Sequence, residues 1–293
     1  MKAKVNGTEI FYDVEGTGLA VTPSGMVEKP VCVILHGGPG GDHSAYRPWL
    51  SELSEYMQLI YVDHRGTGRS GKVPFETLKI EQFADDLDAL RESLGFEKWN
   101  VLGCSFGGMW ALTYAVKYQQ KIQKLILLDT TASWKEDWEA IHKTIEEWAN
   151  KDQKRVYKEI FEGKIGTTEQ SKAWYKIMLP LYIHKFDPKI AREFVARGKG
   201  SAEVSQYMWK NVMFDYDLRD SLSTIKVPTM IMVGKYDWVT PISQSRYLAK
   251  HIPGAKLVVF QNSGHMVYMD ENKKFLEATM SFLKLRQRPK ASA

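Results

Sequence analysis

Gly103-Cys104-Ser105-Phe106-Gly107-Gly108 is the stretch that decides the fold. Apolar residues over 99–104 predict a strand before it, and apolar spacing over 106–118 predicts a helix after it. A G-x-S-x-G sequence between a strand and a helix is typical of a turn too sharp for side chains larger than glycine. Such a turn holds the serine hydroxyl at the helix N-terminus, where the helix dipole favours developing negative charge. The stretch therefore predicts that Ser105 is a nucleophile.

Strand and helix patterns alternate on both sides of this turn. Apolar runs predict strands over 31–35, 59–62, 124–128, 229–233 and 256–260, and helical periodicity predicts helices over 80–94, 243–251 and 271–284. This alternation implies a doubly wound, mostly parallel α/β sheet with helices on both faces. Asn6-Gly7 supplies the positive φ angles of a tight turn, so residues 2–13 are expected to form an N-terminal antiparallel hairpin.

The alternation stops between residues 132 and 220, where the pattern is mostly helical. We therefore expect an α/β core formed by residues 1–131 and 221–293, with residues 132–220 inserted as a helical cap. Five of the nine tryptophans fall in this insert, namely Trp134, Trp138, Trp148, Trp174 and Trp209. These rings either line a pocket beneath the cap or pack the cap's own small core.

Charge and composition argue against several classes of protein. Lys and Arg exceed Asp and Glu by 40 to 35, but the excess is spread along the chain, so a nucleic-acid partner is not expected. The first residues lack the apolar segment of a signal peptide, and no apolar run approaches the roughly 20 residues of a membrane span. We expect a cytoplasmic protein with no membrane partner. Cys32 and Cys104 are too few for a disulfide framework or a metal cluster.

A serine nucleophile requires a base that removes its proton. Among the seven histidines, His265 lies in a polar loop, 261–265, after the last predicted strand, where its side chain can reach over the carboxyl edge of the sheet. Asp237, which follows strand 229–233, is predicted to orient this base, because the chain order serine, acid, histidine suits a sheet of this kind. Asp129 also ends a strand and is the alternative acid.

Backbone N–H groups on two loops are candidates for binding the oxyanion of an acyl-transfer transition state. Phe106 directly follows the nucleophile and begins a helix. Gly38 lies in His36-Gly37-Gly38-Pro39-Gly40, the glycine-rich loop after strand 31–35, and is the second candidate. Glycines in this loop let a substrate approach the backbone, so Gly37 is also predicted to contact it.

Three stretches together resemble the proline iminopeptidase branch of the α/β-hydrolase superfamily: H-G-G-P-G at 36–40, D-H-R-G-T-G-R-S at 63–70 and G-C-S-F-G-G at 103–108. The resemblance covers the predicted core, about residues 2–131 and 221–285. It implies a serine hydrolase that uses no cofactor and releases a small N-terminal residue, proline first, from a short peptide or another small molecule. It also implies that the H-G-G-P-G loop forms part of the oxyanion hole and that Asp63 and Arg65 hold loops in place.

The resemblance is weaker in the insert. Members of this family hold the substrate's free amino group with glutamates from the cap and, in one branch, with a glutamate directly after the acid of the catalytic triad of serine, acid and histidine. Here Trp238 stands at that second position, and Glu203 is the candidate in the cap, so both are predicted substrate contacts. Many chains with this glycine-rich loop are esterases, lactonases or amidases, so hydrolysis of a neutral acyl substrate is the alternative function. A non-catalytic ligand receptor on the same scaffold is a further alternative.

Overall fold

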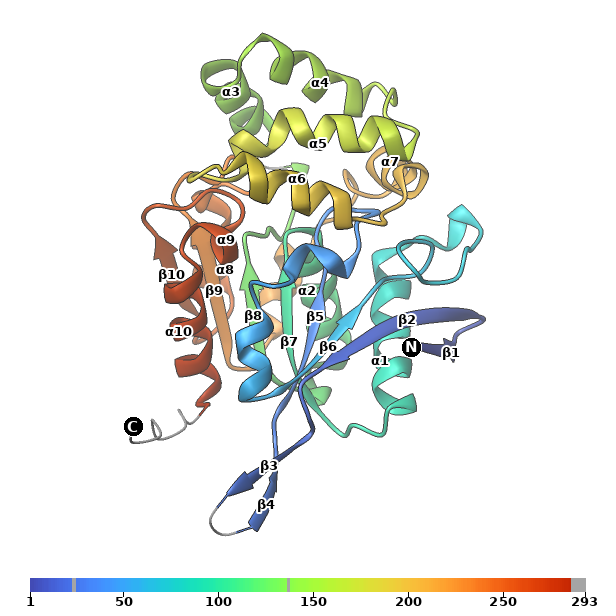
Figure 1. Ribbon diagram of the computed structural model, residues 1–293, viewed down its shortest axis with the longest axis vertical. Helices are drawn as coiled ribbons and strands as arrows, with labels where there is room; N and C mark the ends of the chain where they lie inside the picture. The colour runs from blue at the N-terminus through green and yellow to red at the C-terminus, as the bar shows by residue number, and fades with distance from the viewer. Residues whose placement is uncertain (23–24, 136–137, 286–293) are drawn as a thin grey trace.

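Eight strands form one sheet at the centre of the protein (Figure 1). The computed structural model describes residues 1–22, 25–135 and 138–285. Across the sheet the strands are β1 (Lys2–Val5), β2 (Thr8–Glu15), β6 (Gln58–Val62), β5 (Val31–Leu35), β7 (Trp99–Cys104), β8 (Ile122–Leu128), β9 (Thr229–Gly234) and β10 (Lys256–Phe260). β2 pairs antiparallel with β1 and β6, and the remaining neighbours are parallel. The predicted mostly parallel sheet with an antiparallel start is confirmed.

Helices cover both faces of this sheet, as its strands require. Side chains of a strand alternate between its faces, and here Val33 and Leu35 join one buried cluster while Cys32 and Ile34 join the other. The first cluster includes side chains of α1 (Ile80–Ser93), α2 (Phe106–Tyr118) and α8 (Ile242–His251), and the second includes side chains of α10 (Asn272–Leu283). The predicted helix 271–284 is shorter by one residue at each end and follows a short helix, α9 (Val267–Asp270).

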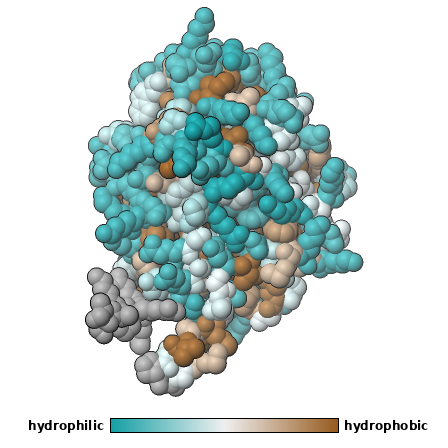
Figure 2. Space-filling view, in the orientation of Figure 1, coloured by the Kyte–Doolittle hydropathy of each residue, from teal (hydrophilic) through white to brown (hydrophobic). Residues whose placement is uncertain are grey.

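A second, two-stranded sheet stands away from the main one and was not predicted. It consists of β3 (Leu19–Thr22) and β4 (Gly25–Glu28), which project from the body of the molecule (Figure 1). Each strand has four residues, too few for a periodic pattern to stand out in the sequence. Val21 and Met26 pair across this hairpin and are 84% and 66% exposed, and Figure 2 shows apolar side chains gathered over it.

Five further helices lie over the carboxyl ends of the parallel strands, within the segment 132–220 (Figure 1). They are α3 (Trp138–Trp148), α4 (Lys151–Phe161), α5 (Thr168–Tyr182), α6 (Pro188–Arg197) and α7 (Ala202–Asn211). Capping boxes at Asn150 and Thr167 fix the first turns of α4 and α5, because in each the side chains of the cap residue and of a glutamine satisfy free N–H groups. Across the described ranges, no helix is both long and apolar enough to cross a membrane.

Candidate active site

Ser105 occupies the strand–helix turn that the sequence predicted. β7 ends at Cys104 and α2 begins at Phe106, and between them Ser105 has φ 57° and ψ −122°, a strained backbone conformation for a residue with a side chain. A Cβ atom on Gly107 would overlap the backbone carbonyl oxygen of Leu35. The turn therefore packs directly against the end of the neighbouring strand, and it holds the serine side chain above the sheet.

Three side chains from distant parts of the chain form a hydrogen-bonded row in this place. His265 Nε2 lies 2.9 Å from Ser105 Oγ, and His265 Nδ1 lies 2.9 Å from each carboxylate oxygen of Asp237. His265 and Asp237 are 4% and 5% exposed, so both are screened from water. Since a carboxylate only accepts, Nδ1 carries the proton and Nε2 is free to accept the serine proton. The structure thus brings together the three residues that the sequence singled out.

The carboxylate of Asp237 is held by its own loop as well as by His265. Its Oδ1 accepts hydrogen bonds from the backbone N–H groups of Val239 and Thr240, at 2.8 and 3.0 Å, and its Oδ2 accepts one from Thr240 Oγ1 at 2.8 Å. These three donors fix the carboxylate in place. They leave its charge available to stabilise a protonated His265.

The alternative acid, Asp129, lies next to the triad but is bonded elsewhere. It is fully buried, and its Oδ1 accepts the backbone N–H of Gly234 at 2.9 Å. Burial, and secondly the charge of Asp237, raise the pKa of Asp129 well above its usual range. His265 Nδ1 is bonded to Asp237, so the geometry selects Asp237 as the partner of the histidine.

The glycine-rich loop after β5 packs against the nucleophile at Gly37, and Gly38 follows in the same loop. Gly38 has φ +68°, which side chains disfavour, and a Cβ atom on Gly37 would lie 3.2 Å from Ser105 Cβ. The N–H of Gly37 donates to Tyr46 Oη at 2.8 Å and is therefore occupied. Phe106 is the first residue of α2, where a backbone N–H has no partner within the helix. The two predicted oxyanion donors, Gly38 and Phe106, both line the cavity described below.

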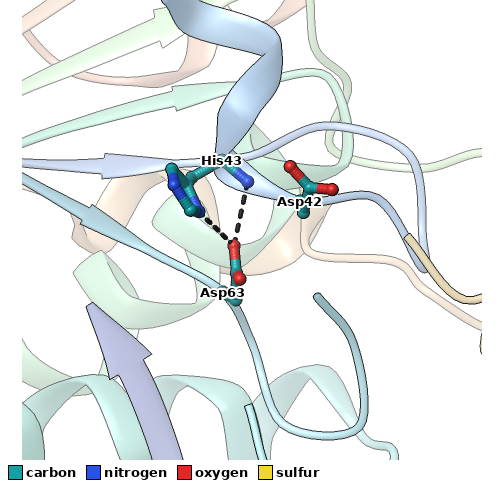
Figure 3. A group of neighbouring side chains, drawn as sticks. All are labelled: Asp42, His43 and Asp63. Carbon is teal, nitrogen blue, oxygen red and sulfur yellow. Dashed lines mark hydrogen bonds and ion pairs between the residues drawn. The ribbon is translucent and has the colours of Figure 1, made fainter. Parts of the chain in front are cut away.

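The loop after β6 is tied to the glycine-rich loop through Asp63. Asp63 Oδ1 accepts from His43 N at 2.9 Å and His43 Nδ1 at 2.7 Å (Figure 3). Its Oδ2 accepts from the backbone N–H of Arg69 at 2.9 Å. Burial opposes ionisation of Asp63, but the hydrogen bonds from His43 and the electrostatic effects of His36 and His43 together outweigh it and lower the pKa of the carboxyl. Arg65 forms a buried two-point ion pair with Asp86, with both N–O distances 2.6 Å. These bonds fit the loop-holding role that the resemblance implied.

Asp42, His43 and Asp63 also bring three potential metal-ligand atoms within 4.8 Å of one another (Figure 3). Each of these groups already has a hydrogen-bond partner in the protein. His43 Nδ1 faces Asp63, and the two oxygens of Asp42 accept the backbone N–H groups of Ser44 and Lys199. We therefore interpret the group as the link between two loops of the core and the chain segment between α6 and α7.

A cavity of about 200 Å³ lies between the triad and the helices above it. Its aromatic lining includes Trp134, Trp174, Trp209 and Trp238, whereas Trp138 and Trp148 lie outside it. Three of the five tryptophans of the insert therefore face the cavity, and Trp148 is half exposed to solvent. Gly37 and Trp238 line the cavity, as expected for substrate contacts.

The structure does not bring Glu203 together with the other predicted substrate contacts. Glu203 lies in the first turn of α7, its side chain is exposed, and it is not part of the cavity lining. A glutamate in the first turn of a helix is favoured by the helix dipole, which accounts for its presence there. Among the described residues, Asp42 is the one carboxylic acid outside the triad that lines the cavity, and Lys172 is the one lysine or arginine.

Two tyrosines of α5 that sequence reasoning missed face the site. The ring of Tyr182 lies 5.4 Å from the ring of His265, and Tyr175 Oη lies 3.6 Å from the position of a Cβ atom on Gly38. The two tyrosines are seven residues apart, which is two helical turns, so they share one face of α5. That spacing was the available signal in the sequence.

A comparison with protein families identifies the scaffold. The model of the alpha/beta hydrolase fold family matches residues 30–272. The chain belongs to this family. Proline iminopeptidase PfmaB of Pestalotiopsis fici is 30% identical to this α/β hydrolase, and the match covers 93% of the present chain and 98% of the relative. The proline iminopeptidase of Saccharolobus solfataricus is 33% identical, over 86% and 84% of the two chains.

A solved structure shows the same fold over nearly the whole chain. The esterase EaEST from Exiguobacterium antarcticum superposes on this α/β hydrolase with a TM-score of 0.76 and 26% identity, covering 96% of this chain and 97% of the esterase. The proteins similar to this α/β hydrolase are thus enzymes of the same fold, and they include both proline iminopeptidases and an esterase. The family resemblance drawn from the three stretches of sequence is confirmed, and the protein is an enzyme of this fold.

Proposed function

We propose that this α/β hydrolase is a serine hydrolase that forms an acyl-enzyme on Ser105. The proposal rests on the hydrogen-bonded row of Asp237, His265 and Ser105. His265 Nδ1 lies 2.9 Å from Asp237 Oδ1, and His265 Nε2 lies 2.9 Å from Ser105 Oγ. His265 is held in the tautomer that accepts the serine proton, and Ser105 is raised into the cavity by the turn after β7. This arrangement matches the requirements of an activated serine nucleophile.

The reaction proceeds in two halves. His265 Nε2 takes the proton from Ser105 Oγ as the oxygen attacks the carbonyl carbon of the substrate, and the oxyanion is held by the N–H groups of Gly38 and Phe106. Collapse of this intermediate breaks the bond to the leaving group, which receives the proton from His265. A water molecule then loses a proton to His265 and attacks the acyl carbon. The bond from that carbon to Ser105 Oγ breaks as His265 returns the proton to the serine oxygen, which releases the acid and restores the free enzyme. Asp237 keeps the imidazole oriented in both halves.

The substrate that we propose first is a short peptide with an N-terminal proline or another small apolar residue. Two relatives at 30% and 33% identity are proline iminopeptidases, which supports this choice. An aminopeptidase must also bind the ammonium group of its substrate, and a buried ammonium needs a carboxylate partner. Within the described part of the lining, Asp42 is the carboxylate outside the triad that can supply this charge, and it is 5% exposed.

A neutral ester or lactone is the second candidate substrate, favoured by the surroundings of Asp42 and of the triad acid. Both oxygens of Asp42 already accept backbone N–H groups, from Ser44 and from Lys199. Trp238, directly after the triad acid, offers an apolar ring at a position where one branch of the family has a glutamate. A cavity with this lining suits an uncharged acyl group.

One substrate panel decides between these candidates. Proline p-nitroanilide, N-acetylproline p-nitroanilide and p-nitrophenyl butyrate are compared by kcat/KM in the wild-type enzyme and in Asp42→Asn. The first candidate predicts that the free amine is required, and that Asp42→Asn lowers kcat/KM for proline p-nitroanilide about tenfold or more while the butyrate rate changes little. Equal or better turnover of the N-acetylated compound and the ester would favour the neutral substrate. Labelling of Ser105 by a fluorophosphonate, and its loss in Ser105→Ala, tests the serine mechanism itself.

A further inference from the structure

Tyr175 places a hydroxyl group beside the loop that carries the oxyanion donor Gly38. Its Oη lies 3.6 Å from the position that a Cβ atom on Gly38 would take, which is ordinary contact distance. Tyr175 lines the cavity together with Gly38 and Ser105. The helix α5 thus brings a hydrogen-bond donor from above the sheet to the same place that two backbone N–H groups approach from the sheet.

The ring of Tyr175 is held firmly enough to aim this hydroxyl. Trp174 and Phe194 pack edge-on against it, with ring centroids 5.1 and 6.0 Å away and interplanar angles of 87° and 66°. Aromatic pairs in this geometry are attractive beyond the area that they bury. The side chain therefore has little freedom to turn away from Gly38.

The hydroxyl of Tyr175 is available to a substrate. Across the residues that the structure describes, no hydrogen-bond partner is found for Tyr175 Oη, although the ring is largely buried and lines the cavity. Burial, and secondly the negative charge of Asp42, raise the pKa of Tyr175 above its usual value. The group therefore remains protonated at neutral pH and acts as a donor.

We propose that Tyr175 Oη donates a third hydrogen bond to the carbonyl oxygen of the substrate as that oxygen becomes an oxyanion. The inference rests on the proposed acyl transfer at Ser105. Since this hydroxyl lies 3.6 Å from the position of a Cβ atom on Gly38, we place an oxyanion held by the N–H groups of Gly38 and Phe106 within its reach. The tyrosine keeps its proton throughout, so no proton balance changes. The cap then supplies one donor of the oxyanion hole, and the core supplies two.

The test compares the transition state with the ground state in Tyr175→Phe. Hydrolysis of p-nitrophenyl butyrate gives kcat and KM, and 1,1,1-trifluoropentan-2-one, which Ser105 converts to a hemiketal oxyanion with the same acyl chain, gives an inhibition constant. Loss of one oxyanion donor costs up to about 100- to 1000-fold in kcat, and loss of the third of three donors is expected to cost about 10- to 100-fold. The inhibition constant should rise by the same factor, while KM changes less than about threefold.

The matched control is Tyr216→Phe. Tyr216 is also a buried tyrosine, its Oη donates to the backbone carbonyl of Met109 at 3.1 Å, and it is not part of the cavity lining. This variant should keep the wild-type kcat and inhibition constant. The inference is overturned if Tyr175→Phe retains kcat within twofold, or if kcat falls while the ketone binds as tightly as before, since a merely structural tyrosine gives these results. Fluorophosphonate labelling of Ser105 in the wild-type enzyme shows separately whether the proposed function holds.

Discussion

Replacing Asp237 by Asn is the perturbation that most directly tests the proposed triad. Asp237 Oδ1 accepts two backbone N–H groups, from Val239 and Thr240, so the amide oxygen of the asparagine must take that position. The amide NH₂ then falls at Oδ2, 2.9 Å from His265 Nδ1. The hydroxyl of Thr240, which donates to Oδ2 in the wild-type enzyme, can rotate and accept from the new NH₂. The local structure is therefore preserved.

The substitution nevertheless changes which ring nitrogen of His265 carries the proton. The new NH₂ lies as close to Nδ1 as the amide oxygen does, 2.9 Å in each case, so it can donate to Nδ1 and populate the tautomer in which Nε2 carries the proton, and this tautomer cannot take the proton of Ser105. In a serine protease the same exchange lowers kcat by about 10⁴-fold. That factor corresponds to about 5 kcal/mol of transition-state stabilisation, at 1.36 kcal/mol for each tenfold change. We expect a loss of about 10³- to 10⁴-fold in this enzyme.

The rate of Ser105 phosphonylation by a fluorophosphonate measures this loss without knowledge of the natural substrate, and p-nitrophenyl butyrate hydrolysis measures it in turnover. Asp129→Asn is the matched control, because Asp129 is also a buried carboxyl at the end of a neighbouring strand. It should lose less than about tenfold, since Asp129 bonds to Gly234 and not to His265. The assignment of the acid is refuted if Asp129→Asn is the more damaging change, or if Asp237→Asn keeps a tenth of the wild-type rate.

Two further predictions concern stability. Gly107→Ala should lower the free energy of unfolding by about 3 kcal/mol, because the new Cβ overlaps the carbonyl oxygen of Leu35. Gly198→Ala, where no atom lies closer than 3.8 Å to the new Cβ, should change this free energy by less than about 1 kcal/mol. Urea unfolding measures both variants, and equal losses of stability would contradict the packing argument. Burial lowers the pKa of His64 from 6.5 to about 3, so between these values the unfolded chain binds a proton that the folded protein excludes, and stability falls as pH falls. His64→Gln should make this fall shallower by up to about 1.4 kcal/mol per pH unit, and identical slopes for variant and wild type from pH 6 to 4 would contradict the burial argument.

The sequence alone carried most of the fold because its strongest signals are local. Alternation of apolar strands with amphipathic helices is read within windows of 5 to 15 residues, and the strands and helices of the core begin and end within about two residues of the expected positions. The hairpin of β3 and β4 escaped because strands of four residues carry too little pattern. The sharp turn at Ser105 was readable because glycine and serine report on backbone geometry directly.

What the sequence by itself indicated about the site is the proposed roles of Ser105 and His265, whose neighbours in the chain form the turns that present them. Tertiary structure decided the rest. Asp129 and Asp237 look alike in sequence, since each ends a strand, and only the loops after β8 and β9 place one of them against His265. Glu203 and Tyr175 both lie on cap helices, and the packing of those helices turns the first to solvent and the second toward Gly38. Distances between segments far apart in the chain depend on how whole elements pack, and no local pattern records them.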